Sequence, residues 1–240
     1  MNKSIFLSTA GRCGTHWMKH ILSYTLELKS DYQSYLQINP NKVALRTSKD
    51  AIREMKKKEE EHPGGSIFVG HNPIIELMPL KEMVNIIAVI RDPRDICVSA
   101  TYYMMKNDEE FDQNKFDQLF QGEFIGGGPN PDYNESFIKD IKKIPHVVLK
   151  FEDMVSNSYE SMSIILDSFS YEYDKELLKT AIEKYSFKTL SSGREVGVED
   201  RGNHYRKGLI GDWKNYFTEE KNKEFCERHK LLMERWGYDE

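Results

Sequence analysis

The sequence predicts an α/β fold: a single doubly wound domain with a central parallel sheet flanked by helices. Short apolar, β-prone runs alternate along the chain with segments of helical periodicity. The run from Val84 to Ile90 is mostly apolar, which indicates a strand buried on both faces, as in parallel sheets. Ligands of such sheets bind at the carboxyl ends of strands, so the residues that follow each predicted strand form the candidate site.

The expected elements follow in chain order. Ile5 to Leu7 is the first strand, and a polar, glycine-containing loop leads from it into a helix with apolar positions at helical spacing from Trp17 to Leu26. Further strands are expected at Ile67 to Val69, Val84 to Ile90 and Val147 to Leu149. Helices are expected from near Asp95, from Ser158 to Phe169, and after Thr218 as N-cap.

The length of the chain and its lack of repeats and linkers indicate a single domain that spans residues 1–240. The chain has no internal repeat and no linker-like stretch, and 240 residues are enough for one sizeable core. The charged run over residues 52–61 is interpreted as a solvated helix face.

Composition limits the classes of function. The net charge of −5 argues against a general nucleic-acid binder, so we expect no nucleic-acid partner. The longest purely apolar run, Ile86 to Ile90, is too short to span a membrane, and no signal peptide fits the N-terminus. Three scattered cysteines indicate a reducing compartment. We therefore expect a cytoplasmic protein.

The loop from Thr9 to Trp17 joins the first strand to the first helix. Backbone N–H groups at a helix start favour a bound anion, and glycines allow close approach to its oxygens. The G-x-x-x-x-G-K-[ST] form of ATP-binding loops is absent, because Thr9 replaces the first glycine and Thr15 the lysine. A metal site at Cys13, His16 and His20 would need a fourth ligand, and none is evident, so we expect no metal.

Two further segments carry cations beside small or hydroxyl residues. Near the C-terminus, Arg206 and Lys207 precede Gly208, a combination suited to one phosphate. After the third strand, Arg91 and Ser99 can return to the same edge of the sheet. The alternative for the second segment is a helix entry that Asp92, Pro93 and Asp95 cap, with Arg91 in a salt bridge.

The chain resembles the cytosolic-type sulfotransferases, which use 3′-phosphoadenosine 5′-phosphosulfate (PAPS) and release 3′-phosphoadenosine 5′-phosphate (PAP). The resemblance spans residues 4 to about 236 and rests on several motifs in the family's order. They are Gly11 to Trp17, His71-Asn72-Pro73, Arg91 to Ser99, Phe151 to Met154, Ser186-Phe187-Lys188, and Arg206-Lys207-Gly208 with Gly211-Asp212-Trp213-Lys214.

This resemblance implies a PAPS-dependent sulfotransferase with a P-loop-like phosphosulfate-binding loop. It assigns His71 as the general base and Arg12, in place of the family's lysine, as the group that stabilises the leaving phosphate. The implied cofactor-binding residues are Arg12, Cys13, Gly14, Thr15 and His16 in the loop, Trp17, Phe151 and Phe187 beside the adenine, and Arg91, Ser99, Arg206, Lys207 and Gly208 at the 3′-phosphate. Cys13 is expected to lie at a helix N-terminus beside Arg12, and both features lower the pKa of a thiol. We therefore also expect Cys13 to be the most reactive thiol.

The sequence departs from the family at Val69, where a lysine is usual, and in the degraded dimer motif from Lys214 to Lys223, so the oligomeric state is open. The expected partner is a small-molecule acceptor, an alcohol, phenol or amine. Its pocket is expected to use Tyr32 to Ile38, Tyr102 to Met105 and Gly126 to Tyr133. Two alternative functions are an ATP-dependent phosphotransferase of the P-loop type and a non-catalytic nucleotide-binding regulator.

Overall fold

The computed structural model describes residues 3–9, 11–29, 48–70, 80–105, 111–121 and 146–238. The chain forms two compact units, each built from two stretches of sequence. Unit 1 comprises Met1–Ile90 and Phe137–Tyr185, and unit 2 comprises Arg91–Ser136 and Ser186–Glu240. A single domain over residues 1–240 stays a prediction.

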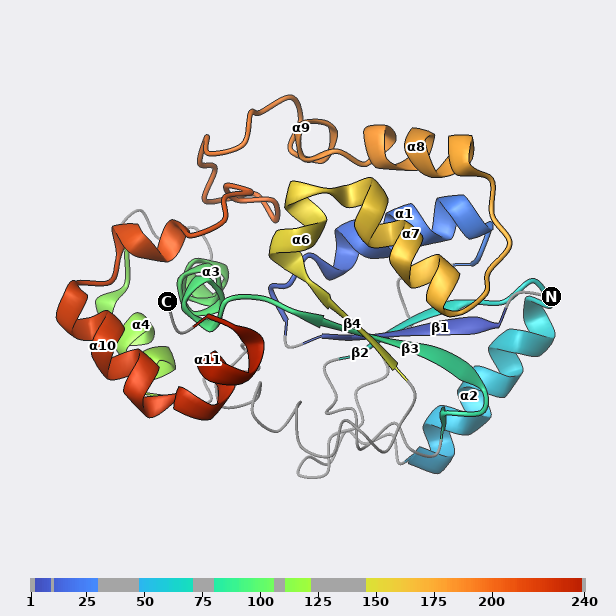
Figure 1. The fold of residues 1–240 in the computed structure, drawn as a ribbon, viewed down its shortest axis with the longest axis horizontal. Helices are drawn as coiled ribbons and strands as arrows, with labels where there is room; N and C mark the ends of the chain where they lie inside the picture. Colours follow the sequence, from blue (N-terminus) through green and yellow to red (C-terminus); the bar gives the residue numbers. More distant parts are fainter. Residues whose placement is uncertain are drawn as a thin grey trace. The chain divides into compact units, whose positions relative to one another are not determined.

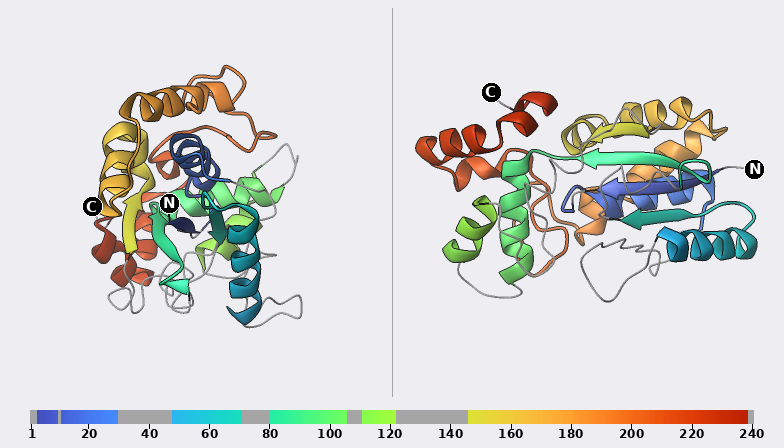
Figure 2. Two further views of the ribbon diagram at one scale, coloured as in Figure 1. Left: turned by 90° about the vertical axis from the view of Figure 1, so that its right-hand side faces the viewer. Right: turned by 90° about the horizontal axis from the view of Figure 1, so that it is seen from below.

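Unit 1 contains a four-stranded parallel sheet. Its strands are β1 (Ser4–Thr9), β2 (Ile67–Gly70), β3 (Val84–Ile90) and β4 (His146–Lys150), in the order β2-β1-β3-β4 (Figure 2). Leu7 pairs with Val69 on one side and with Ile87 on the other, so β1 and β3 are central. All four strands coincide with the predicted runs to within two residues at either end.

The helices of unit 1 pack around this sheet. They are α1 (Thr15–Leu26), α2 (Ser48–Glu61), α6 (Phe151–Ser156), α7 (Ser158–Ser168) and α8 (Lys175–Lys184). Figure 1 shows α1, α7 and α8 on one face of the sheet. A parallel sheet needs such cover because each strand presents apolar side chains on both faces. The alternation of strands and helices predicted for the chain is therefore confirmed.

Burial in unit 1 follows the sequence pattern. Every residue of β1 is buried, and so is every residue of β3 except Asn85. In α1, Met18, Ile21 and Leu22 are fully buried, at the spacing of one helix face. In α2, Met55 is buried, whereas the lysines and glutamates from 56 to 61 are half-buried or exposed, as the interpretation of the charged run predicts.

In its described residues, unit 2 contains helices and no strand. The helices are α3 (Pro93–Met105), α4 (Gln113–Phe120), α9 (Phe187–Leu190), a 3-10 helix (Asp212–Asn215), α10 (Glu219–Arg228) and α11 (Lys230–Trp236). Its core is aromatic, with Phe116, Phe120, Phe217 and Phe225 buried together. Their ring centroids lie 5.4–6.3 Å apart in tilted or edge-to-face arrangements, which are favoured geometries.

Three element boundaries bear on the candidate site. Helix α3 begins at Pro93 instead of near Asp95, because proline suits the first helical position and Asp92 accepts the Arg94 N–H. Helix α6 begins at Phe151 with no loop after β4, an element that the sequence analysis does not contain. Thr218 caps α10 by accepting the N–H of Lys221 at 3.2 Å, as predicted.

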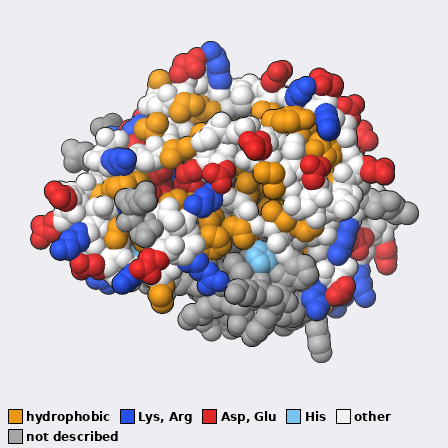
Figure 3. Space-filling model, viewed as in Figure 1, with side chains coloured by type: hydrophobic (Ala, Val, Ile, Leu, Met, Phe, Trp, Pro, Cys, Tyr) orange, Lys and Arg blue, Asp and Glu red, His pale blue; other side chains and the backbone are white. Residues whose placement is uncertain are grey.

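The surface carries charges of both signs. Figure 3 shows lysines and arginines interspersed with acidic side chains across the described part of the face that it displays. Within the described ranges, no helix combines the length and the apolar character that are needed to cross a bilayer.

Candidate active site

The loop between β1 and α1 has an unusual backbone. Gly11, Arg12 and Gly14 all lie in the left-handed region, with φ of 83°, 53° and 75°. Arginine rarely adopts this conformation, and α1 then begins directly after Gly14. Such a turn aims successive N–H groups at one point, and the helix start adds the positive end of its dipole. The first turn of α1 contains no acidic residue that would oppose an anion.

Side-chain hydrogen bonds hold this loop. The Thr15 hydroxyl contacts that of Thr9 at 3.0 Å, and Thr9 Oγ1 accepts the Gly11 N–H at 3.3 Å. Cys13 is fully buried, and its thiol donates to the Gly11 carbonyl at 2.9 Å. The expectation that Cys13 is the most reactive thiol is therefore wrong for this structure, because an alkylating reagent cannot reach a buried sulfur atom. Arg12 and His16, by contrast, are partly exposed.

Aromatic rings close over the start of α1. A Cβ atom added to Gly14 would come within 2.8 Å of the Phe151 ring, so glycine is required there both by φ and by space. Phe151 in turn meets Trp17 edge-to-face at 6.4 Å. The indole N–H of Trp17 is buried and has no hydrogen-bond partner among the described residues of the chain. Two of the three residues predicted to lie beside the adenine are thus together, next to the loop.

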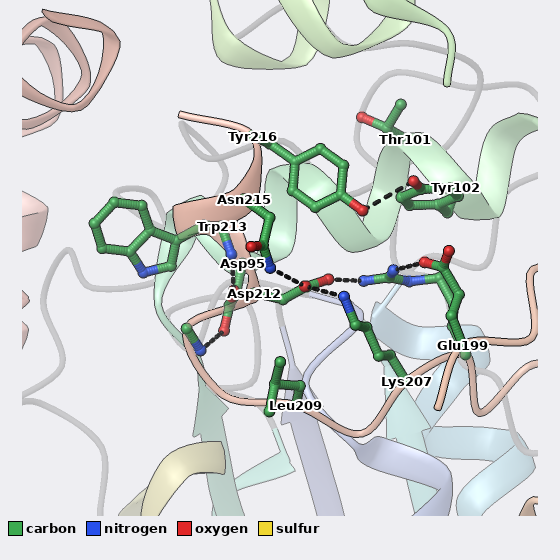
Figure 4. Close-up of polar contacts among 12 residues, drawn as sticks. Asp95, Thr101, Tyr102, Glu199, Lys207, Leu209, Asp212, Trp213, Asn215 and Tyr216 are labelled. Atoms are coloured by element: carbon green, nitrogen blue, oxygen red, sulfur yellow. Dashed lines mark hydrogen bonds and ion pairs between the residues drawn. The ribbon is translucent and has the colours of Figure 1, made fainter. Parts of the chain in front are cut away.

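In unit 2, Asp95 joins the start of α3 to the C-terminal motif. Its two carboxylate oxygens accept the N–H groups of Gly211 and Trp213, each at 2.9 Å (Figure 4). Arg91 contacts the same carboxylate at 3.4 Å and donates to the Leu209 carbonyl at 3.2 Å. The two predicted 3′-phosphate segments, separated by more than 100 residues in the sequence, are therefore bonded to each other.

Asp92 and Arg94 have a structural role at the same helix start. Arg94 is buried, pairs with Asp92 at 2.8 Å and donates to Asn222 and to the Tyr238 carbonyl. Its guanidinium also lies 3.9 Å from the centre of the Trp213 ring. Burial raises the pKa of Asp92, although the hydrogen bonds from Arg94 oppose the rise. The helix-entry alternative is thus realised in part, since Asp92 accepts the Arg94 N–H and Arg91 forms its salt bridge with Asp95.

Arg206 and Lys207 share one buried carboxylate. The Asp212 carboxylate accepts hydrogen bonds from Arg206 at 2.5 Å, from Lys207 at 2.6 Å and from the Asn215 amide at 3.0 Å (Figure 4). Arg206 also pairs with Glu199. Burial alone would raise the pKa of Asp212, but the hydrogen bonds from Lys207, Arg206 and Asn215 outweigh it and hold the pKa below its usual range.

Tyr102 covers this cluster. The Arg206 guanidinium lies 4.4 Å from the centre of the Tyr102 ring, and the Tyr102 hydroxyl meets that of Tyr216 at 2.9 Å (Figure 4). Burial and the bond to Tyr216 raise the pKa of Tyr102. Tyr102 is one of the residues expected to line the acceptor pocket. In the structure its ring packs against Arg206, a residue predicted to bind the 3′-phosphate. Tyr103, from the same expected lining, is 53% exposed.

Gly208 repeats in unit 2 the arrangement at Gly14. Its φ is +65°, and an added Cβ would meet the Phe187 ring at 2.5 Å. Phe187, the third predicted adenine neighbour, therefore packs directly on the glycine whose N–H is expected to bind the 3′-phosphate. Ser99 is buried in α3, in the same unit.

Some predicted positions lie outside the described residues. These are His71, Tyr32 to Ile38 and Gly126 to Tyr133. Val69, which stands where the family has lysine, is buried in β2. The described residues contain no group of three or more His, Cys, Asp or Glu side chains that could hold a metal ion.

Comparison with known proteins assigns the family. The model of the sulfotransferase domain matches residues 2–237. The chain belongs to this family. Among curated relatives, sulfotransferase 6B1 of Danio rerio is 28% identical over 164 residues, which cover 64% of this chain and 55% of that protein. Flavonol 4'-sulfotransferase of Flaveria chlorifolia is 28% identical over 250 residues, which cover 90% of this chain and 74% of that protein.

The fold is likewise that of known sulfotransferases. The crystal structure of mouse sulfotransferase SULT7A1 complexed with PAP aligns with a TM-score of 0.70 and 20% identity, covering 97% of this chain and 85% of that one. The predicted parallel α/β fold is confirmed. The predicted enzyme class, a PAPS-dependent sulfotransferase, is confirmed at the level of the family, and with it PAPS as the cosubstrate.

The carboxylates that pair with the predicted phosphate-binding cations are not among the predicted site residues. Asp95 was considered only as a cap, and Asp212 and Glu199 were given no role beside Arg206. A local signal for these ion pairs is present, since Asp95 lies four residues after Arg91, and Asp212 and Glu199 lie within seven residues of Arg206. The bonds from the Gly211 and Trp213 N–H groups to Asp95 join segments more than 100 residues apart, and no local pattern in the sequence indicates them. The predicted roles of the site residues stay predictions.

We expect Asp212→Asn to lower stability at neutral pH by roughly 1.5–3 kcal/mol, the value of hydrogen bonds to charged groups. The folded-state pKa of Asp212 is depressed, so its contribution is complete above the usual carboxylate pKa and is lost as the pH falls through the folded value. Urea unfolding at pH 7 and at pH 3 measures this. A variant equally destabilised at both pH values would contradict the coupling to ionisation.

We expect Gly208→Ala to disturb the packing of Phe187, because alanine is strained at a φ of +65° and its Cβ would overlap the ring. Gly193 is the matched control, since it also has a positive φ, of 94°, but open space around its Cβ position. Thermal unfolding should show a larger loss for Gly208→Ala than for Gly193→Ala. Equal losses would mean that only the backbone angle matters.

Proposed function

We propose that this sulfotransferase moves the sulfuryl group of PAPS to the hydroxyl, or the amine, of a small-molecule acceptor. The observation that carries the proposal is the loop from Gly11 to Gly14, with three left-handed residues directly before α1 and no acidic residue in the first helical turn. This backbone suits the 5′-phosphosulfate, because N–H groups and a helix dipole stabilise an anion without a metal.

The second half of the proposal assigns the 3′-phosphate to unit 2. Arg91, Ser99, Arg206, Lys207 and the Gly208 N–H supply three cations and two neutral donors, which suit a dianion. In the structure these cations are neutralised by Asp95, Asp212 and Glu199. A ligand must therefore offer more than one negative charge to compete for them, which favours a phosphate monoester over a singly charged group.

The adenine is proposed to lie against aromatic rings. Trp17 and Phe151 contact each other beside Gly14, and Phe187 packs on Gly208. Phe151 and Phe187 thus each pack on a glycine whose N–H is proposed to bind a phosphate group. Ring faces give such a base apolar contact area without demanding a specific hydrogen-bonding pattern.

The proposed reaction is an in-line displacement at sulfur. The acceptor oxygen loses its proton to His71 and forms the new bond to sulfur, while the bond between sulfur and the bridging oxygen of PAPS breaks. The electron pair of that bond remains on the departing phosphate of PAP, whose charge Arg12 and the loop N–H groups stabilise. Arg12 is partly exposed in the loop, so its guanidinium can reach a bound anion.

The acceptor class is an alcohol, phenol or amine. The regulator alternative predicts PAP binding without turnover, and the phosphotransferase alternative predicts use of ATP, so one assay separates the three. We expect transfer of ³⁵S from labelled PAPS to at least one member of a panel of phenols, alcohols and amines, without competition from ATP. Tight PAP binding with no transfer to any acceptor would support the regulator instead.

We expect His71→Ala to lose roughly two to four orders of magnitude in the rate of sulfuryl transfer, as for removal of a general base. Its PAP affinity should stay near the wild-type value, because the base contacts the acceptor proton and not the nucleotide. Single-turnover rates and PAP titrations measure the two quantities separately. Turnover close to wild type would remove His71 from the mechanism.

We expect Arg206→Ala to weaken PAP by roughly 10- to 150-fold, the equivalent of one charge-assisted contact of 1.5–3 kcal/mol. Adenosine 5′-phosphosulfate, which lacks the 3′-phosphate, should lose much less. Because both ligands are titrated into the same variant, any general damage from the lost bonds of Arg206 to Asp212 and Glu199 affects both alike. Equal losses would show that Arg206 does not read the 3′ group.

A further inference from the structure

The side chain of Arg194 lies in the 191–205 segment and donates almost entirely to backbone carbonyls. Its Nη1 donates to Val198 O at 2.8 Å and to Arg206 O at 2.7 Å, and its Nη2 donates to Tyr205 O at 2.5 Å. Its Nε donates to Ser191 O at 3.2 Å. One planar guanidinium thus fixes four carbonyl groups. Two of them belong to Arg206 and to Tyr205 directly before it.

Backbone bonds extend this connection. The Gly197 N–H donates to Lys207 O at 2.8 Å, and the Asp200 N–H donates to Arg206 O at 2.9 Å. The Arg206 carbonyl therefore accepts from both the Arg194 guanidinium and the Asp200 amide, which fixes the orientation of this peptide group. The direction of the Arg206 and Lys207 side chains follows from these peptide planes.

Arg194 is itself held in place. Its side chain is only 16% exposed, and its Nε lies 3.8 Å from a carboxylate oxygen of Asp200. Its guanidinium lies 5.6 Å from the centre of the Phe187 ring, the ring that packs on Gly208. A half-buried arginine that gives its donors to main-chain oxygens stabilises a loop shape, since it cannot also offer those donors to a ligand.

We propose that Arg194 is a positioning residue for the 3′-phosphate. It does not contact the nucleotide but sets the backbone of Tyr205, Arg206 and Lys207, so that both cations point at one phosphate. This inference rests on the proposed function of Arg206 and Lys207. It adds a residue outside every motif that the sequence analysis considered, and it gives the 191–205 segment a specific task in nucleotide recognition.

The planar fork of arginine is essential to this role. A lysine at position 194 keeps the charge, but a single ammonium group cannot reach four carbonyls that lie around a guanidinium plane. Arg194→Lys should therefore leave Arg206 and Lys207 present but less well aimed. The loss should appear in binding of ligands that carry a 3′-phosphate and should be small for ligands that lack it.

The experiment compares PAP with adenosine 5′-monophosphate by calorimetric titration of the wild type and Arg194→Lys. We expect the variant to bind PAP at least about tenfold more weakly, the equivalent of one charge-assisted contact, with adenosine 5′-monophosphate changed less than about threefold. Arg228→Lys is the control, because it makes the same chemical change in the same unit at a residue whose side chain is 40% exposed and pairs with Glu224 one helical turn away.

Two results would overturn the inference alone: unchanged PAP affinity in Arg194→Lys, or equal weakening of both nucleotides, which would indicate a general structural role. A wild type that does not prefer PAP over adenosine 5′-monophosphate would instead refute the proposed 3′-phosphate site, and the inference with it.

If Arg194→Lys does not fold, amide hydrogen exchange of the wild type tests the same point. PAP, but not adenosine 5′-monophosphate, should slow exchange at the Gly197 and Asp200 amides, because both donate to the peptide groups that carry the two cations. Unchanged exchange at both amides would overturn the inference.

Discussion

The buried carboxylate of Asp212 is the interaction on which the C-terminal motif depends. It neutralises Arg206 and Lys207 at once, and it binds the Asn215 amide at the end of the same 3-10 helix. Two adjacent cations in a largely buried place would otherwise carry a high desolvation cost and repel each other. With Asp212 present, the motif keeps two cations close together in a protein of net charge −5, where a long-range positive field is absent.

The proposed anion sites of the two units are built from different chemical groups. In unit 1 the loop from Gly11 to Gly14 uses main-chain N–H groups, which carry no net charge and need no carboxylate partner. In unit 2 full charges are used, and Asp95, Asp212 and Glu199 compensate them. Both units place an aromatic ring over a left-handed glycine, Phe151 on Gly14 and Phe187 on Gly208, so a side chain is excluded at each point where main chain would approach the ligand.

Sequence reasoning predicts what is local and periodic. The four strands, α1, α7 and the Thr218 cap follow from runs of apolar residues and from capping chemistry, and the motif residues follow from resemblance. It does not predict long-range polar contacts: the Gly211 N–H donates to the Asp95 carboxylate across 116 residues of sequence, and neither segment contains a local pattern that indicates the other. It also misjudged Cys13: charge and helix position suggest a reactive thiol, but burial depends on the three-dimensional packing of the loop.

The internal carboxylates also determine which ligands can bind. A ligand that takes Arg206 and Lys207 must replace contacts to Asp212 and Glu199 that already exist, so only the difference between the two sets of contacts contributes to affinity. A singly charged group exchanges one ion pair for a similar one and gains little. A phosphate dianion with three acceptor oxygens can engage both cations and the Gly208 N–H together, which a carboxylate of the protein cannot do. The proposed selectivity for a 3′-phosphate thus rests on competition within the protein as well as on direct attraction.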